Sequence, residues 1–257
     1  MQRPPKPHIR HAFDRAAGTY DSAAAFQRLV CERLLARLPA IPPPAAIVDA
    51  GCGTGYGAKL LAERWPAAAL VLADFAPAML AGSASQGLAV CADIEALPFQ
   101  AGTFELYWSS LAVQWCDLSH SLAEAARSLA PGGRLALSTL GPGTFAEIDA
   151  AFASATASSD PHRHVLDFLP PEAVHAACVA AGLRDIVVER EAVAIHYPDL
   201  KTLLRAIKAI GAQGVANRRP TLLGKNAWRR IEADYERHRS SAGLPATYDV
   251  IYCTAQR

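Results

Sequence analysis

Along the chain, short apolar runs alternate with longer stretches in which apolar side chains recur at helical spacing. The apolar runs predict buried β-strands at residues 47–50, 70–73, 88–91, 104–108 and 134–140, with a turn at residues 131–133. Helical patterns separate these runs at residues 56–64, in the stretch after Pro77 and at residues 119–129. Strands that alternate with helices in this order predict an α/β fold, with a mostly parallel sheet covered by helices on both faces.

Further elements are predicted before and after this repeat. The first ten residues are rich in proline and cations and are expected to be loosely ordered, whereas residues 13–38 predict one helix. After the fifth strand, residues 144–154 and 170–182 predict helices, and residues 186–197 predict a sixth strand. The helical stretch 198–242 precedes a last strand at 247–254, so we expect it to form a lid inserted between these last two strands.

Residues 47–55, with the sequence IVDAGCGTG, are the most informative run in the chain. An apolar strand ends in an acid, and a glycine-rich turn follows it. Glycine lacks a Cβ and tolerates positive φ, so such a turn lets the backbone pass close to a ligand at the carboxyl end of a strand. Tyr56 stands where the dinucleotide fingerprint G-x-G-x-x-G requires its third glycine. A turn without a ligand is the alternative interpretation.

Acids also follow the next two predicted strands. Asp74 ends the second strand, where a carboxylate can accept hydrogen bonds from a ribose diol. Asp93 ends the third strand, and Ser109 ends the fourth. Each acid has a simpler interpretation, since Asp is common in surface turns and at helix N-caps. The order of these residues along the chain is what favours a nucleoside site.

The D-x-G-x-G-x-G pattern resembles motif I of the class I S-adenosylmethionine (SAM) methyltransferases. The resemblance implies a Rossmann-like, seven-stranded sheet, SAM as the cofactor and S-adenosylhomocysteine as the product. In that family the glycines lie against the methionine part of the cofactor, and an acid such as Asp93 accepts from the adenine amine. The implied cofactor-binding residues are Asp49, Gly51, Cys52, Gly53, Gly55, Asp74, Phe75, Asp93, Ile94 and Ser109.

Motifs outside the cofactor site resemble a narrower family, the malonyl-[acyl-carrier protein] O-methyltransferases of biotin synthesis. Ser110 departs from the pattern, because many relatives are expected to carry Asn there. The resemblance runs from Phe13 to the C-terminus. It rests on residues 13–21 (FDRAAGTYD), Gln27, residues 111–116 (LAVQWC), 138–140, 168–170, 204–212, 223–225 and 244–248.

This resemblance implies methyl transfer to the free carboxylate of a malonyl thioester on acyl-carrier protein, or on coenzyme A. A carboxylate with a pKa of about 4 is ionised at neutral pH, so the reaction needs no general base. Tyr20 is a candidate catalytic residue because a neutral donor would hold the anion without blunting its attack. Gln114 and Trp115 are candidates because they follow the fourth strand, where substrate groups lie in this superfamily. Tyr20 and Trp115 have the alternative interpretation of ordinary core packing.

Cations within the expected lid are candidates for docking an acidic carrier protein. Lys201, Arg205 and Lys208 have i, i+4, i+7 spacing and therefore share one helical face. The alternative interpretation is a solvated helix surface. The remaining candidates for docking are Arg219, Lys225 and Arg229.

Composition narrows the remaining possibilities. The net charge of +1 favours neither nucleic acid nor a membrane surface, and no apolar run approaches the ~20 residues of a membrane span. The six cysteines form no C-x-x-C pair, so we expect no metal site and a cytoplasmic protein.

We expect a cap at 1–40, a core at 41–197, a lid at 198–245 and a final strand at 246–257. A methyltransferase of a quinone precursor or small acid, or a SAM-binding assembly factor without catalysis, are the alternatives.

Overall fold

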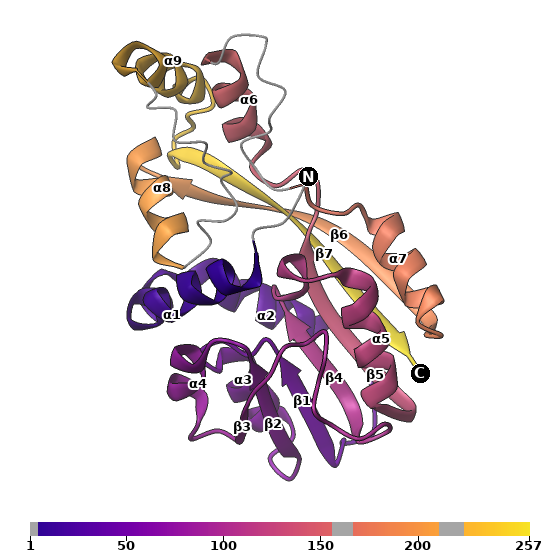
Figure 1. The fold of residues 1–257 in the computed structure, drawn as a ribbon. Helices are drawn as coiled ribbons and strands as arrows, with labels where there is room; N and C mark the ends of the chain where they lie inside the picture. Colours follow the sequence, from indigo (N-terminus) through magenta and orange to yellow (C-terminus); the bar gives the residue numbers. More distant parts are fainter. Residues whose placement is uncertain (1–4, 156–166, 211–223) are drawn as a thin grey trace.

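One sheet of seven strands organises the protein (Figure 1), in the order β3-β2-β1-β4-β5-β7-β6. The computed structural model describes residues 5–155, 167–210 and 224–257. β1 to β5 pair in parallel, whereas β7 runs antiparallel to both of its neighbours. The α/β fold predicted from the sequence is therefore confirmed. The strands are β1 (Ala46–Ala50), β2 (Ala69–Asp74), β3 (Leu88–Cys91), β4 (Phe104–Ser110), β5 (Leu129–Leu140), β6 (Arg184–Tyr197) and β7 (Leu244–Gln256).

Helices cover both faces of the sheet, as predicted. Successive residues of β1 belong to different cores, with Ile47 packed on the α2 and α3 side and Val48 on the α5 and α7 side. The helices of the described ranges are α1 (Lys6–Ala23), α2 (Ala25–Arg37), α3 (Tyr56–Arg64), α4 (Pro77–Ser83), α5 (Leu118–Ser128), α6 (Ala146–Ala155), α7 (Pro171–Ala180), α8 (Leu200–Ala209) and α9 (Lys225–Glu236), with a short 3-10 helix at Val113–Trp115. None of these helices is long and apolar enough to cross a membrane.

The N-terminal region differs from the expectation in two respects. α1 begins at Lys6, so residues 6–10 of the segment expected to be loose are helical, because prolines at the start of a helix have a preset φ. The single helix predicted at 13–38 is also broken at Ala24. α1 contacts α4 and α8, whereas α2 packs on α3 and the sheet, so tertiary contacts impose the break. Arg28 donates to the freed Asp21 carbonyl at 2.6 Å.

The predicted insertion between the last two strands is present, and it contains α8 and α9. β7 begins at Leu244, earlier than expected, because the pairing with β6 continues to the Tyr197–Leu244 pair. α9 packs on α6, which follows β5, so the upper part of the molecule in Figure 1 combines two separate chain segments. The turn expected at residues 131–133 lies inside β5, where the pairing with β4 shifts register.

Candidate active site

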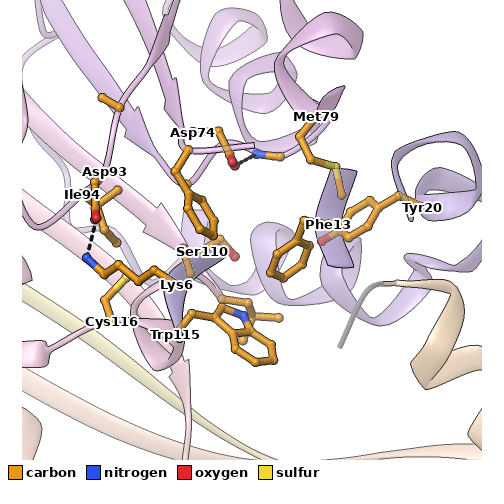
Figure 2. A pocket seen from close by; sticks show the side chains of 16 residues that line it. Lys6, Phe13, Tyr20, Asp74, Met79, Asp93, Ile94, Ser110, Trp115 and Cys116 are labelled. Carbon is orange, nitrogen blue, oxygen red and sulfur yellow. Dashed lines mark hydrogen bonds and ion pairs between the residues drawn. The ribbon is translucent and has the colours of Figure 1, made fainter. Parts of the chain in front are cut away.

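Three adjoining cavities lie at the carboxyl ends of β1 to β4, where the strand order reverses and open α/β sheets bind ligands. The first, here called the strand-end cavity, has about 630 Å³ of empty space, part of it open to solvent. Asp74 and Phe75 line it from the end of β2, and Asp93 and Ile94 from the end of β3 (Figure 2). Residues 6, 13 and 20 of α1 also line it, so that helix passes over the cavity.

The glycine turn after β1 is held tightly against the chain that follows β4. Gly51 has a φ of +78°, and a Cβ at this position would lie 2.3 Å from the Cβ of Ala112. Only glycine fits there. Asp74 fixes the same turn, since its carboxylate accepts from the backbone N–H of Gly53 and of Ala76, each at 2.9 Å. Each carboxylate oxygen keeps a further lone pair for a ligand.

A second cavity, here called the glycine-loop cavity, lies beside this turn and contains buried polar atoms without partners. The Oδ2 of Asp49, the Oε1 of Gln27 and the Nε1 of Trp108 are buried and make no hydrogen bond. Burial, together with the nearby charge of Asp74, raises the pKa of Asp49 to about 8. Buried polar groups are normally satisfied, so this cavity fits a ligand that brings a cationic hydrogen-bond donor.

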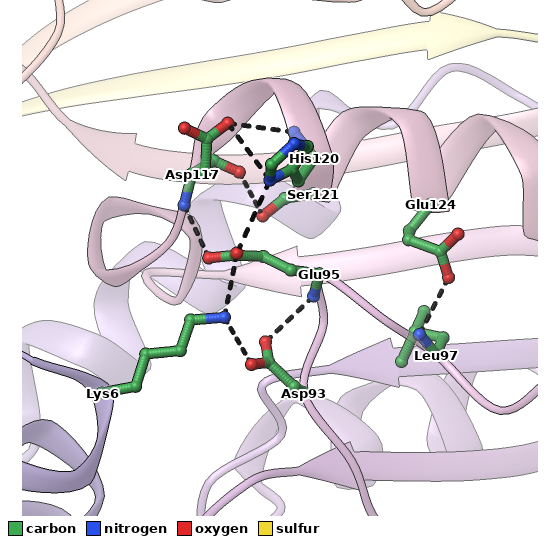
Figure 3. A network of polar contacts seen from close by, with 8 residues as sticks. All are labelled: Lys6, Asp93, Glu95, Leu97, Asp117, His120, Ser121 and Glu124. Carbon is green, nitrogen blue, oxygen red and sulfur yellow. Dashed lines mark hydrogen bonds and ion pairs between the residues drawn. The ribbon is translucent and has the colours of Figure 1, made fainter.

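Lys6 lines the strand-end cavity and takes part in a network of polar contacts (Figure 3). Its ammonium pairs with Asp93, and with Glu95 at 2.9 Å, so α1 is tied to the segment after β3. Glu95 in turn accepts from the backbone N–H of Asp117 at 2.7 Å. The ligand atoms of Asp93, Glu95 and Cys116 lie within 4.8 Å of one another, but both carboxylates already pair with the Lys6 ammonium.

The third cavity, here called the lid cavity, has a different chemistry. Of its described lining residues none is Lys, Arg or His, and Ile207 of α8 and Ile210, which follows that helix, cover it. Phe26 stacks on Tyr248 at a centroid distance of 3.7 Å, and Phe13 meets the edge of Trp115 at 5.5 Å. The lining is Phe13, Tyr20, Phe26, Gln27, Leu111, Gln114, Trp115, Leu140, Phe145, Ile207, Ile210 and Tyr248.

The three candidate catalytic residues, Tyr20, Gln114 and Trp115, line this cavity but differ in burial and hydrogen bonding. Burial raises the pKa of Tyr20 well above its usual range, so its hydroxyl stays neutral and able to donate. Trp115 is buried. The amide of Gln114 donates to the carbonyl of Leu111 at 2.6 Å and accepts from Thr139 at 3.5 Å. Leu111 itself has a φ of +52°, a strained backbone beside the site.

The residues proposed for the cofactor do not all face the first two cavities. Cys52 lines the glycine-loop cavity, but Gly55 begins α3 with a φ of +93° and lines none of the three. Ser109 is buried and donates to the carbonyl of Ala50 at 2.7 Å. The neighbouring Ser110, rather than Ser109, lines the first two cavities.

The lid cations lie on the outer surface. Lys201, Arg205 and Lys208 are exposed on α8, opposite its buried residues Leu200 and Leu203. Lys225 and Arg229 are exposed on α9, and Arg219 lies outside the described residues.

Similar proteins match this chain in sequence over almost its whole length. A protein of Dechloromonas aromatica (strain RCB) named malonyl-[acyl-carrier protein] O-methyltransferase is 48% identical over 256 residues, covering 99% of this chain and 96% of that protein. The chain belongs to the malonyl-[acyl-carrier protein] O-methyltransferase family. A member from Laribacter hongkongensis (strain HLHK9) is 42% identical and covers 98% of this chain and 89% of its own length. The family model described as "Methyltransferase domain" matches residues 48–137, from β1 into β5.

Solved structures support the fold. The phosphoethanolamine N-methyltransferase 2 of Haemonchus contortus, in complex with S-adenosyl-L-methionine, superposes with a TM-score of 0.59 at 17% identity, over 95% of this chain and 57% of that one. A geranyl diphosphate C-methyltransferase of Streptomyces coelicolor A3(2) gives 0.51 at 17% identity, over 88% and 78%. At these identities the likeness concerns the methyltransferase fold alone.

Two side chains at the site of this methyltransferase had no role in the sequence-based prediction. Gln27 belongs to the N-terminal motif of the family, but the motif alone indicated no chemical role for it. Its position between the glycine-loop cavity and the lid cavity suggests one. Lys6 lay in the segment expected to be loose. The proline-rich start was the available signal for Lys6, because proline is favoured at the start of helices.

Proposed function

We propose that this protein transfers the methyl group of SAM to the free carboxylate of a malonyl thioester on acyl-carrier protein, the first step of biotin (pimeloyl) synthesis. One observation carries the proposal. A glycine-loop cavity with a buried carboxylate at Asp49, whose Oδ2 has no partner, meets an uncharged lid cavity at Tyr20, which lines both. The first suits a cationic cofactor, and the second suits an acyl chain that ends in a carboxylate.

The cofactor is SAM, whose sulfonium supplies an electrophilic methyl group when it is bound. Asp49, Gly51, Cys52 and Gly53 would hold its amino-acid end. Asp74 and Phe75 would hold the ribose, and Asp93 and Ile94 the adenine, since these residues line the strand-end cavity. Gly55 and Ser109 would support the loop and the strand end from behind, in keeping with their places outside the cavities.

The chain's part in the transfer is orientation and exclusion of water. A carboxylate oxygen forms a bond to the methyl carbon while the carbon–sulfur bond breaks, the electron pair stays on sulfur, and no proton moves. Tyr20 would donate to the carboxylate as a neutral group, and Trp115 would wall the acyl chain. Gln114 would keep the Leu111 segment in place through its hydrogen bond. Orientation alone contributes on the order of 7–11 kcal/mol to such a step.

The carrier protein would dock on the exposed cations of α8 and α9, because carrier domains are acidic and charge complementarity speeds encounter. α8 and its C-cap present Ile207 and Ile210 to the lid cavity, and the helix presents Lys201, Arg205 and Lys208 to solvent. A carrier seated on its outer face would therefore bring its prosthetic arm to the substrate cavity. We assign residues 198–245 to this lid, 1–40 to the cap, and 41–197 with 246–257 to the core.

Mass spectrometry of malonyl-carrier protein incubated with the enzyme and SAM tests the proposal. A gain of one methyl group, about 14 Da, is expected, with loss of the gain under mild base as for an ester. Acetyl-carrier protein, which lacks the free carboxylate, is the control and should not change. Malonyl-CoA in the same assay measures how much the carrier itself contributes. SAM binding without transfer to any of these acyl groups would contradict the proposal.

A further inference from the structure

Gln27 lies at the junction of the glycine-loop cavity and the lid cavity. Among the described residues, Tyr20 and Gln27 alone line both the glycine-loop cavity and the lid cavity. Both flank the break at Ala24, Tyr20 near the end of α1 and Gln27 in the first turn of α2. The break therefore brings two donors from different helices to one junction.

Gln27 differs in its hydrogen bonding from Gln114, the other side-chain amide in the lid cavity. Gln114 is committed to the protein, since it donates to Leu111 and accepts from Thr139. The Oε1 of Gln27 is buried and has no partner. A buried acceptor without a donor costs free energy in the ligand-free protein, which a bound donor would recover.

The surroundings indicate which groups of the two ligands would meet this amide. The unpartnered acceptors Gln27 Oε1 and Asp49 Oδ2 both belong to the glycine-loop cavity, so they suit one ammonium donor. Arg28 lines the same cavity and donates one N–H to the Asp21 carbonyl, so its other guanidinium N–H groups could bind the cofactor's own carboxylate. The amide N–H of Gln27 is then left for the lid cavity, where no described cation competes for a substrate anion.

We propose that Gln27 is a positioning residue that links the two sites, its Oε1 accepting from the SAM ammonium and its Nε2 donating to the carboxylate that is methylated. This inference rests on the proposed function. A single planar amide held at both ends fixes the distance between cofactor and nucleophile. Because the amide is neutral, it orients the carboxylate without neutralising the charge that attacks the methyl carbon.

Two substitutions separate the two ends of the amide. Gln27→Met keeps the length and shape of the side chain but makes neither hydrogen bond. We expect the affinity for SAM, measured by calorimetry, to fall about tenfold, and kcat with malonyl-carrier protein at saturating SAM to fall at least tenfold. Gln27→Glu, assayed at pH 8, keeps an oxygen for the ammonium but sets a second anion against the substrate. It should bind SAM within threefold of wild type while kcat stays at least tenfold low.

Gln86→Met is the matched control, because Gln86 also has a buried, unpartnered Oε1 but lines none of the three cavities. It should leave SAM affinity and kcat within about twofold. Thermal melting of each variant verifies that it is folded. A Gln27→Met variant with normal affinity and kcat would overturn the inference, since packing alone would then explain the residue.

The Gln27→Glu results judge each half separately. If Gln27→Glu recovers both kcat and SAM affinity, the proposed hydrogen bond from Gln27 to the substrate carboxylate is wrong. If a folded Gln27→Glu variant does not recover SAM affinity, the proposed contact with the SAM ammonium is wrong. If wild type does not methylate malonyl-carrier protein, the proposed function fails instead. The calorimetric comparison of the variants still decides the ammonium contact in that case.

Discussion

The cofactor side and the lid side of this site are built in opposite ways. The strand-end and glycine-loop cavities are lined by acids and by glycines at the ends of parallel strands, with backbone N–H groups turned onto Asp74. The lid cavity is lined by apolar and aromatic side chains that come from α1, α2, β5, α8 and β7 and from loops between them. The cofactor side takes its acids and glycines from the strand ends and is covered by α1 and α2, whereas the lid side is made by tertiary assembly alone.

The difference has a consequence for how each side tolerates change. Backbone positions at the strand ends are fixed by the hydrogen bonds of the sheet, so a Cβ added at Gly51 or Gly55 would clash with the Cβ of Ala112 or of Ser83. Side chains from several elements in the lid cavity can adjust to one another. Substitutions should therefore have sharp effects on cofactor affinity and graded effects on the acyl substrate.

The largest effect is expected for Gly51→Ala. The new Cβ would lie 2.3 Å from the Cβ of Ala112, and a φ of +78° is strained for alanine. SAM affinity should fall more than about 100-fold, as measured by calorimetry. Gly18→Ala is the control, because nothing lies within 4 Å of its Cβ position and the residue is helical. Alanine there should stabilise α1 by up to about 1 kcal/mol and leave affinity unchanged. Equal affinity of the two variants would contradict the rigid strand-end model.

A comparison of Asp74→Ala with Tyr20→Phe separates the two sides directly. Asp74→Ala removes the acceptor of two backbone N–H groups and the proposed ribose contact, so SAM affinity should fall about 100-fold. Tyr20→Phe removes one neutral donor, so affinity should stay within threefold while kcat falls about tenfold. Calorimetry and steady-state rates on malonyl-carrier protein measure the pair. The same loss of SAM affinity in both would mean that Tyr20 belongs to the cofactor side.

Reversal of the charges on α8 tests the outer surface of the lid. A Lys201→Glu, Arg205→Glu, Lys208→Glu triple variant should raise the KM for malonyl-carrier protein about tenfold and leave SAM affinity unchanged. Its KM should also depend less on salt than that of wild type. Lys59→Glu on α3, where Lys59 is 63% exposed, is the control and should change neither quantity. An unchanged KM in the triple variant would place the carrier elsewhere.

The smallest effect is a change in stability with pH. Burial raises the pKa of Asp49 to about 8, far above its unfolded value of about 4. The folded protein therefore binds a proton that the unfolded chain releases, and the free energy of unfolding falls as pH rises from about 4 to about 8. Asp49→Asn removes this decline, so at pH 8 it should be more stable than wild type by about 1–3 kcal/mol.

Thermal melting between pH 5 and 8.5 without ligand measures the difference in stability, here called the gap, between Asp49→Asn and wild type. The gap should widen with pH, and saturating SAM should narrow it, because the ammonium pairs with Asp49 only in wild type. A gap that is constant across this range would show that the carboxyl of Asp49 does not titrate in it.

More of the cofactor side than of the lid side could be predicted from the sequence, although Lys6 and Gln27 were missed there. An apolar strand, an acid and spaced glycines lie within one continuous segment, and their geometry follows from backbone rules alone. Gln27, Phe145 and Tyr248 are far apart in sequence and meet only because α2, the segment after β5 and β7 pack together. The break at Ala24 was missed for the same reason, since neither glycine nor proline marks it and contacts with different neighbours produce it.

The Tyr197–Leu244 pair makes the lid an easily altered part of the chain. These two residues are neighbours in the β6–β7 ladder, so residues 198–243 leave the sheet and return to it at adjacent points. A segment whose ends are already joined can lengthen or shorten at little cost, because doubling a loop adds only about 0.6 kcal/mol of closure entropy. Evolution can therefore exchange the segment proposed to recognise the acceptor for another without moving the strand ends proposed to hold the methyl donor.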